Sequence, residues 1–276
     1  MFSPYYAWAR RGGAHADPED HCCINVALYG AAGKRWTMTE RAARHMRRSA
    51  RDFTVGPSTL AWDGSALSVS FDEIGAPIPL RVRGRVRLHP AGLSRFVTAL
   101  DDDGRHRWGP IAAVSRVEVE LDTPRARWQG HAYFDSNEGD EPIDRPFIEW
   151  DWARAALADG RTAVVYDVRQ KPRDSEPRAD RVLALRFAPD GAVDAFDAPP
   201  RRPLPRTLWR LRPSMRSEAP AARSQWLEDT PFYSRAVLDA TLCGQRVVAM
   251  HETLDVRRLE SLVVQSMLPW RMPRRR

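Results

Sequence analysis

An all-β fold of antiparallel sheets is the fold class that this sequence predicts, and two patterns carry the prediction. Along Ile78–Leu88 apolar residues alternate with arginines, and a period of two is typical of a strand with one buried and one solvated face. Turn signals such as Asp63-Gly64 and Asp190-Gly191 separate the apolar runs. Many short strands divided by such signals are typical of β-sandwiches and β-barrels.

The first strands are expected to form hairpins. Cys22–Tyr29 is an apolar run long enough for a strand, Gly30–Gly33 supplies a turn, and Trp36–Thr39 returns as its partner. Arg41–Arg51 is so rich in alanine and arginine that it could form a short helix. Asp63-Gly64 lies between two apolar runs and suits a hairpin with a type I′ turn, which needs positive φ angles.

The middle and the second half continue as strands. Arg116–Leu121 alternates charged and apolar residues, and a second β-rich half begins near Trp128. The proline-rich segment Ala198–Pro205 is expected to cross between sheet edges, because proline has no N–H for a ladder hydrogen bond. Further strands, including a late hairpin around Gly244, are expected at Arg161–Arg169, Arg181–Phe187, Phe232–Leu242 and Gln245–His251.

A short amphipathic helix is expected at the C-terminal end, where the apolar residues follow the i, i+3, i+4 spacing of one helix face. These residues are Leu259, Leu262, Val263, Ser266 and Met267. A chain of 276 residues can bury a core in each of two domains. We expect these domains to comprise residues 1–127 and 128–276.

Composition excludes several classes of protein. The net charge of +7 comes from 43 basic and 36 acidic residues, and because both signs are interspersed we interpret them as solvated faces and expect no nucleic-acid partner. No run of eighteen uncharged apolar residues occurs, so no spanning helix is predicted. No signal-like run follows Met1, and two of the three cysteines are adjacent. These features favour a cytoplasmic protein with reduced thiols.

Two apparent ligand motifs are rejected on spacing. Gly30–Lys34 resembles a phosphate loop, yet its glycines are wrongly spaced and Arg35 stands where a hydroxyl is required. Asp20–Cys23 contains three types of metal ligand, but adjacent side chains on a strand diverge and cannot surround an ion. We therefore expect neither a nucleotide nor a metal.

The candidate chemical centre is Gly130–Trp152, where aromatic and acidic residues are densest. Asp135 directly follows the aromatic pair Tyr133-Phe134. Asn137 and Gly139 then indicate a tight turn. Burial of a carboxyl group among aromatic rings would disfavour its charged form and keep it protonated near neutral pH. Taken by itself, a lone aspartate after a strand is more often a turn or cap residue than a catalytic group.

Several segments together resemble the carotenoid 1,2-hydratases of phototrophic bacteria, also called hydroxyneurosporene synthases, over essentially the whole chain. The segments are Phe2–Trp8, Cys23–Tyr29, Trp36–Glu40, Gly56–Ser58, the element Tyr133-x-Asp135-x-Asn137-x-Gly139, and Trp150–Trp152. The resemblance implies two lipocalin-like antiparallel β-barrel domains. Longer members of the family have residues ahead of Phe2–Trp8, so the first barrel is expected to be incomplete at its start.

The resemblance also implies an enzyme, a hydro-lyase of carotenoid biosynthesis in the spheroidene and spirilloxanthin pathway. Its substrates would be water and an acyclic carotenoid such as neurosporene or lycopene. Water would add to the terminal C1–C2 double bond without a cofactor. Two alternatives stay open: a lipocalin-like carotenoid or lipid carrier without catalysis, and an isomerase or cyclising enzyme.

Four residues carry functional weight by resemblance: His106, Trp108, Tyr133 and Asp135. Our hypothesis is that Asp135 protonates the CH carbon of the double bond and that the rings of Trp108 and Tyr133 stabilise the resulting tertiary cation. His106 would come from a loop and would either orient the attacking water and accept its proton, or reload Asp135. The residues themselves do not choose between these two roles.

The remaining expected site residues are walls of the cavity and surface contacts. Phe134, Trp150 and Trp152 are expected to line the carotenoid site, and His131 shares a strand face with Tyr133 by alternation. Arginines interleave with apolar residues in Arg201–Arg216 and Met267–Arg276, a composition typical of peripheral contact with the inner, intracytoplasmic membrane. No oligomeric state is predicted.

Overall fold

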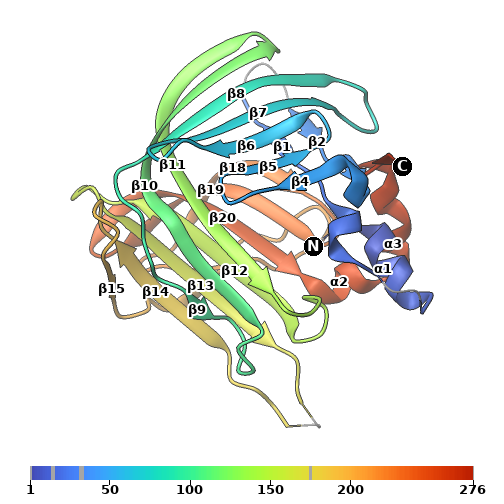
Figure 1. Ribbon diagram of the computed structural model, residues 1–276. Helices are drawn as coiled ribbons and strands as arrows, with labels where there is room; N and C mark the ends of the chain where they lie inside the picture. The colour runs from blue at the N-terminus through green and yellow to red at the C-terminus, as the bar shows by residue number, and fades with distance from the viewer. Residues whose placement is uncertain (1, 14–15, 31–33, 174–175, 276) are drawn as a thin grey trace. The chain divides into compact units, whose positions relative to one another are not determined.

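The computed structural model describes residues 2–13, 16–30, 34–173 and 176–275, and Figure 1 shows them as a predominantly β structure with a few short helices. The prediction of an all-β antiparallel fold is confirmed in this broad sense. Most of the predicted turn at Gly30–Gly33 lies outside the described residues. The helices in the described residues are all too short or too polar to span a bilayer.

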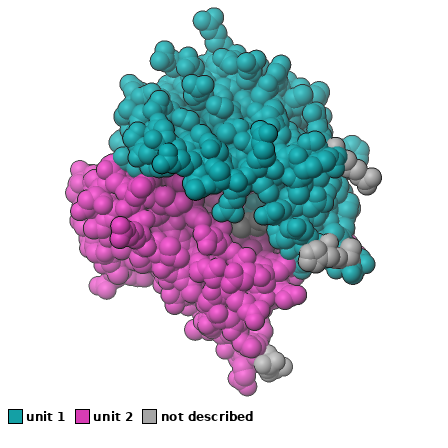
Figure 2. All heavy atoms as spheres, viewed as in Figure 1, with its two compact units in different colours: residues 1–90, 116–132, 265–276 teal, residues 91–115, 133–264 magenta. Residues whose placement is uncertain are grey.

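The chain divides into two compact units, which Figure 2 distinguishes by colour. One unit holds residues 1–90, 116–132 and 265–276, and the other holds residues 91–115 and 133–264. Strands β10 (His106–Thr123) and β11 (Ala126–Gly139) each contribute residues to both units. We predicted residues 1–127 and 128–276 as domains, meaning parts of the chain that fold independently. The compact units do not test independent folding, so these domains stay a prediction.

The first large sheet has eight strands in the order β11-β10-β8-β7-β6-β5-β4, with β9 paired to β10. Its other strands are β4 (Met46–Arg48), β5 (Asp52–Val55), β6 (Ser58–Trp62), β7 (Leu67–Ile74), β8 (Arg81–Pro90) and β9 (Thr98–Ala99). The alternation predicted for Ile78–Leu88 is confirmed from Arg81 onward, since the arginines at 81, 83, 85 and 87 are exposed while Val82 and Leu88 are buried. Its first residues were predicted wrongly, because Ile78 and Leu80 precede the strand and are exposed.

The second large sheet has seven strands in the order β15-β14-β13-β12-β20-β19-β18. They are β12 (Phe147–Ala156), β13 (Thr162–Gln170), β14 (Arg181–Phe187), β15 (Val193–Ala195), β18 (Ala222–Asp229), β19 (Tyr233–Leu242) and β20 (Gln245–Asp255). The strands predicted in this half are confirmed. The late hairpin turns at Cys243 and Gly244, whose φ angles of 53° and 71° are both positive, as a two-residue type I′ turn requires.

The prediction of closed β-barrels is wrong. Within the described residues each large sheet has two different edge strands, β11 and β4 in the first and β15 and β18 in the second. Alternating hydrophobicity defines the two faces of a strand, whereas closure depends on tilt and stagger between strands. The sequence pattern carries the first property and not the second.

Short paired segments complete the β structure. Strands β1 (Val26–Leu28) and β2 (Arg35–Thr37) form the predicted first hairpin, although both are shorter than expected. Strand β3 (Glu40–Arg41) pairs in parallel with β21 (Arg274–Arg275). The connection predicted at Ala198–Pro205 was only partly right, because its residues 201–203 form β16 and pair with β17 (Ser214–Arg216). Arginine N–H groups remain available there between the prolines.

The hairpin predicted at Asp63-Gly64 joins β6 to β7, but its turn is not type I′. Gly64 has a φ of +101°, whereas Asp63 is not among the described residues with positive φ. Its carboxylate instead accepts the backbone N–H groups of Ser65 at 2.8 Å and Ala66 at 2.7 Å. The side chain therefore replaces part of the turn's own hydrogen bonding.

The helices are short: α1 (Pro4–Arg11), α2 (Val256–Glu260), α3 (Leu262–Met267) and the 3₁₀ turns η1 (Pro18–His21), η2 (Ala43–His45) and η3 (Leu268–Trp270). The expected C-terminal helix is present but is interrupted at Ser261, whose ψ of 139° is extended. The helix predicted in Arg41–Arg51 is wrong beyond the single turn η2, because β4 pairs with β5 there. Tertiary pairing thus outweighs a weak local propensity.

Candidate active site

Asp135 lies at the centre of a hydrogen-bonded group of aromatic residues in the second compact unit. Strand alternation places Tyr133 and Asp135 on the same face of β11. The Trp108 Nε1–H on β10 donates to Asp135 Oδ2 at 2.8 Å, and the Tyr133 hydroxyl donates to the same oxygen at 3.2 Å. Oδ1 takes part in neither bond. When Asp135 is neutral, the two donors favour Oδ2 as the carbonyl oxygen and place the acidic proton on Oδ1.

The surroundings favour a protonated Asp135. Burial raises the pKa of this carboxyl group, and the negative charge of Glu252 acts in the same direction. The hydrogen bonds from Trp108 and Tyr133 and the positive charge of Arg154 oppose that rise without cancelling it. Burial and the neighbouring carboxyl group also raise the pKa of Tyr133 well above its ordinary value, so Tyr133 stays a phenol and remains a donor.

Trp108 is held rigidly by other aromatic rings. Its side chain is 1% exposed, and its ring meets Tyr166 edge-on at a centroid distance of 5.5 Å, with Phe187 at 6.4 Å and Phe96 at 6.5 Å. Such T-shaped contacts favour one orientation of each ring. The indole N–H is therefore fixed on Asp135, and this geometry favours Trp108 as a hydrogen-bond donor more than as an open aromatic wall.

Strand β12 brings Trp152 and Arg154 to Tyr133. The rings of Tyr133 and Trp152 are 5.5 Å apart, and the Arg154 guanidinium carbon lies 5.2 Å from the centre of the Tyr133 ring. In the sheet register Trp152 lies opposite Tyr166 on β13 and Glu252 on β20. One sheet face thus carries the aromatic and charged groups around Tyr133 and Asp135.

The other expected wall residues occupy different positions. The Trp150 ring contacts Phe147 at 5.8 Å, and alternation turns Phe134 to the face of β11 opposite Tyr133 and Asp135. His131 is exposed and belongs to the first compact unit. Their roles in carotenoid binding stay predictions.

The tight turn predicted at Asn137 and Gly139 is wrong, because β11 runs through both residues. Gly139 is needed for another reason. A Cβ atom there would lie 2.9 Å from Cδ2 and 3.1 Å from Nε2 of His106, which is closer than side chains normally approach. The glycine signal in the motif was real, but it marks close packing on His106 and not a change in chain direction.

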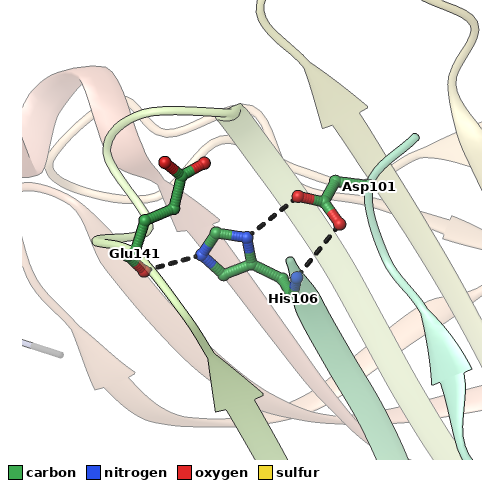
Figure 3. A group of neighbouring side chains, drawn as sticks. All are labelled: Asp101, His106 and Glu141. Atoms are coloured by element: carbon green, nitrogen blue, oxygen red, sulfur yellow. Dashed lines mark hydrogen bonds and ion pairs between the residues drawn. The ribbon is translucent and has the colours of Figure 1, made fainter. Parts of the chain in front are cut away.

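His106 is the first residue of β10 and is buried, so its expected position in a loop was wrong. Figure 3 shows its ring between Asp101 and the main-chain carbonyl of Glu141. Nδ1 lies 3.0 Å from Asp101 Oδ2, Nε2 lies 2.9 Å from the Glu141 carbonyl oxygen, and Asp101 Oδ1 accepts the His106 backbone N–H at 3.0 Å. Both ring nitrogens are therefore engaged, Nδ1 by a carboxylate oxygen and Nε2 by a main-chain carbonyl oxygen.

Asp101, His106 and Glu141 are also close enough to be considered as metal ligands. Their ligand atoms already have protein partners, however. The Glu141 carboxylate accepts Arg105 at 3.1 Å and Arg145 at 3.3 Å, and both His106 nitrogens are hydrogen-bonded as described. We therefore interpret this cluster as a hydrogen-bond network that fixes His106 and the end of β11.

Sequence reasoning missed several neighbours of Asp135. Arg154 had a usable signal, since it has the same parity as Trp150 and Trp152 along one strand. The others had none, because Phe96, Tyr166, Phe187 and Glu252 reach the site from separate strands or loops and their contacts are tertiary.

Comparisons with known proteins agree with one another. The family model "Carotenoid hydratase CrtC" matches residues 1–276. The acyclic carotenoid 1,2-hydratase of Rubrivivax gelatinosus is 63% identical over 278 residues, covering 100% of this chain and 67% of that protein. The enzyme of the same name from Thiocapsa roseopersicina is 49% identical, covering 99% and 67%, and that of Cereibacter sphaeroides is 41% identical, covering 100% and 95%.

A solved structure shows a likeness of fold. The crystal structure of a putative AttH from Nitrosomonas europaea superposes with a TM-score of 0.57 at 15% identity, covering 84% of this chain and 80% of that one.

Proposed function

Because this chain belongs to the CrtC carotenoid hydratase family, we propose that it adds water to the terminal C1–C2 double bond of acyclic carotenoids such as neurosporene and lycopene. The products would be 1-hydroxy carotenoids. The observation that supports this chemistry best is Asp135, a carboxyl group with a raised pKa and with both donors on one oxygen. We further propose that the reaction needs no cofactor.

The first step is proton transfer from Asp135 to the double bond. The π electrons of C1=C2 form a new bond between C2 and the proton on Oδ1, and C1 becomes a tertiary cation. The electrons of the broken O–H bond stay on Asp135 as a carboxylate. Trp108 and Tyr133 already donate to Oδ2, and hydrogen bonds to an ionised acceptor are stronger than those to a neutral one. These donors therefore stabilise the charge that develops on the acid.

The second step is capture of the cation by water. A lone pair of the water oxygen forms the C1–O bond, and the oxonium ion that results loses one proton to the Asp135 carboxylate. The sum is addition of one water molecule, with Asp135 restored to its acid form. One carboxyl group can serve both steps because C1 and C2 are bonded neighbours.

The aromatic rings have separate roles in this scheme. The faces of Tyr133 and Trp152 can stabilise the cation at C1, an interaction worth about 2 kcal/mol in a desolvated site. The hydrogen bonds of His106 favour a positioning role over that of a base, since both of its ring nitrogens are engaged by acceptors. A direct part for His106 in moving the proton of water stays a prediction.

Two broader proposals accompany the reaction. We propose that the sheets are related to lipocalin-like barrels, because most neighbouring strands are also neighbours in the chain, as in up-and-down barrels. We also propose a cytoplasmic enzyme that associates peripherally with the inner, intracytoplasmic membrane. Acyclic carotenoids are apolar polyenes that dissolve in bilayers, so the enzyme must meet its substrate at a lipid surface.

Arg154 gives a testable pH dependence. Hydration requires protonated Asp135, so activity is lost as pH rises through the pKa of that group. Arg154 lowers this pKa, and Arg154→Met should therefore move the alkaline limb of the kcat profile to higher pH. Turnover at the optimum should fall several-fold, because the acid becomes weaker. Arg154→Lys keeps the charge and should leave the limb in place. A limb that stays put in Arg154→Met would contradict an electrostatic role for Arg154.

The proposed activity is tested with lycopene or neurosporene in ¹⁸O-labelled water. We expect a tertiary alcohol that carries the label at C1, detected by mass spectrometry. Bound but unchanged polyene would indicate a carrier, and an isomeric product without added oxygen would indicate an isomerase or cyclising enzyme. Either of these results would overturn the proposal.

A further inference from the structure

An arginine-lined cavity lies in the second compact unit and has no part in the chemistry at Asp135. Its volume is about 650 Å³, and its walls come from residues 210–212, the end of β20, helix α2 and the start of α3. Four of its lining residues are Arg210, Arg212, Arg257 and Arg258. We call this cavity the arginine cavity.

Arg258 holds the two sides of the arginine cavity together. Its Nη1 donates to the Trp209 carbonyl at 2.7 Å and its Nη2 donates to the Arg210 carbonyl at 3.1 Å. The loop is also closed internally, since the Arg210 N–H donates to the Thr207 carbonyl at 2.9 Å. Arg210 has a φ of 62°, in the left-handed region that residues other than glycine seldom adopt. The loop and α2 are thus held together as one surface by the hydrogen bonds of Arg258.

The charges of the arginine cavity do not cancel. Its two acidic lining residues are engaged by Arg257, which lies 3.5 Å from Glu149 and 3.5 Å from Asp255. Glu149 has a further partner in Arg169 at 2.9 Å. Arg210 and Arg212 are exposed, and the described part of the chain supplies no ion pair to either. Two guanidinium groups therefore remain available for an anion from outside.

Exposed apolar side chains flank these guanidinium groups. On the loop Leu208 is 92% exposed and Trp209 is 47% exposed, and at the start of α3 Leu262 is 74% exposed and Val263 is 70% exposed. Leu211 and Leu259 lie three positions from Leu208 and Leu262 and are buried. Some apolar side chains of these segments therefore pack inside the protein, while the four exposed ones remain in solvent. Arginines beside exposed Leu, Val and Trp are typical of a surface that enters the interface of an anionic bilayer.

The segments predicted to contact a membrane are accordingly only partly available. Within Arg201–Arg216, Leu204, Leu211 and Met215 are buried. Arg201 and Arg216 are paired with Asp151 and Asp167 at 2.8 Å and 2.7 Å. Within the tip at residues 207–212, the side chains of Leu208, Trp209, Arg210 and Arg212 remain exposed.

We propose that the arginine cavity binds the phosphate of an anionic phospholipid headgroup, with Arg210 and Arg212 as its ligands. Leu208, Trp209, Leu262 and Val263 then enter the acyl boundary around it. Arginine suits this task because its planar fork donates two parallel hydrogen bonds to phosphate. This inference rests on the proposed hydratase function in one respect: a carotenoid hydratase must reach its substrate at a membrane.

Vesicle binding tests the proposal. In flotation assays the wild-type chain should bind phosphatidylglycerol vesicles and bind phosphatidylcholine vesicles much less. Each arginine at an anionic surface contributes roughly fivefold in binding, so Arg210→Gln/Arg212→Gln should lose about 25-fold on phosphatidylglycerol. Leu208→Ser/Trp209→Ser should weaken binding to both kinds of vesicle.

The matched control is Arg127→Gln/Arg246→Gln, which removes the same charge from two exposed positions elsewhere. It should lose clearly less binding than the cavity variant. Equal losses would show general charge attraction and overturn the site, as would a wild-type chain that ignores phosphatidylglycerol. Displacement from vesicles by millimolar glycerol 3-phosphate would show a site for soluble phosphate and overturn the lipid assignment.

A hydration assay separates this inference from the proposed function. With carotenoid dispersed in detergent, Arg210→Gln/Arg212→Gln should turn over at the wild-type rate. With carotenoid in phosphatidylglycerol vesicles it should be slower. If the wild-type chain hydrated no carotenoid in either preparation, the proposed function would be contradicted. The vesicle-binding result would still test the phospholipid site independently.

Discussion

Asp135→Asn should lower kcat for carotenoid hydration by about 10³-fold or more. The asparagine amide cannot deliver a proton to C2, and general acid catalysis typically contributes about 10²–10⁴-fold. Here the acid is also the group that takes the proton back from water, so both steps of the cycle are affected. The measurement is the initial rate of 1-hydroxy carotenoid formation, followed by chromatography at saturating substrate.

The variant should fold as well as the wild type. Burial raises the pKa of Asp135 in the folded chain, so its contribution to stability is present at low pH and is lost as pH rises through the folded-state pKa. A neutral asparagine avoids that loss, and the melting temperature near pH 7 should not fall. Near-normal hydration by folded Asp135→Asn would contradict the assignment of Asp135 as the proton donor.

Tyr133→Phe is the matched comparison. It removes one of the two donors to Asp135 Oδ2 and keeps the ring, while Trp108 still donates at 2.8 Å. A hydrogen bond to a charged group is worth about 1.5–3 kcal/mol, so the rate should fall roughly 10–100-fold. That loss lies well short of the loss expected for Asp135→Asn. Similar losses in the two variants would indicate disruption of the whole site and not removal of an acid.

The candidate site was predictable from sequence only where its residues share a strand. Tyr133 and Asp135 are two residues apart on β11, and Trp150, Trp152 and Arg154 have one parity on β12, so alternation alone places each set on a face. The hydrogen bond from Trp108 comes from a different strand, and no spacing in the chain predicts it. The resemblance to a known family, and not periodicity, is what linked His106 and Trp108 to Asp135.

The fold shows the same division between local and distant causes. The alternation in Arg81–Leu88 and the turn residue Gly244 are signals that extend over only a few positions. The strand β8 and the hairpin of β19 and β20 were predicted correctly from them. Barrel closure depends on pairing between strands far apart in the chain, and the expected closure is wrong. Gly139 lies between these cases, because its signal was recognised while its cause, the His106 ring, was not visible in the sequence.

Glu73→Ala should destabilise the first compact unit by about 3–5 kcal/mol. Glu73 is 1% exposed on β7, where its carboxylate accepts Arg41 Nη2 at 2.7 Å and the Ser58 hydroxyl at 2.6 Å. Arg41 is itself 5% exposed. Removing the carboxylate would leave a buried guanidinium whose remaining bond, from Nη1 to the Thr39 carbonyl at 3.1 Å, does not neutralise its charge.

Asp72, the residue before Glu73 on the same strand, provides the control. It forms an equally short pair with Arg81 at 2.6 Å, but the side chain of Arg81 is 52% exposed and that of Asp72 is 30% exposed. Water can solvate both partners when that pair is broken, so Asp72→Ala should cost no more than about 1 kcal/mol. Urea unfolding of the two variants measures the difference, provided that their m-values agree. Equal losses would mean that burial does not govern the strength of these pairs. Recovery of stability in Glu73→Leu/Arg41→Met would instead show that the cost of Glu73→Ala comes from the stranded charge and not from the lost volume.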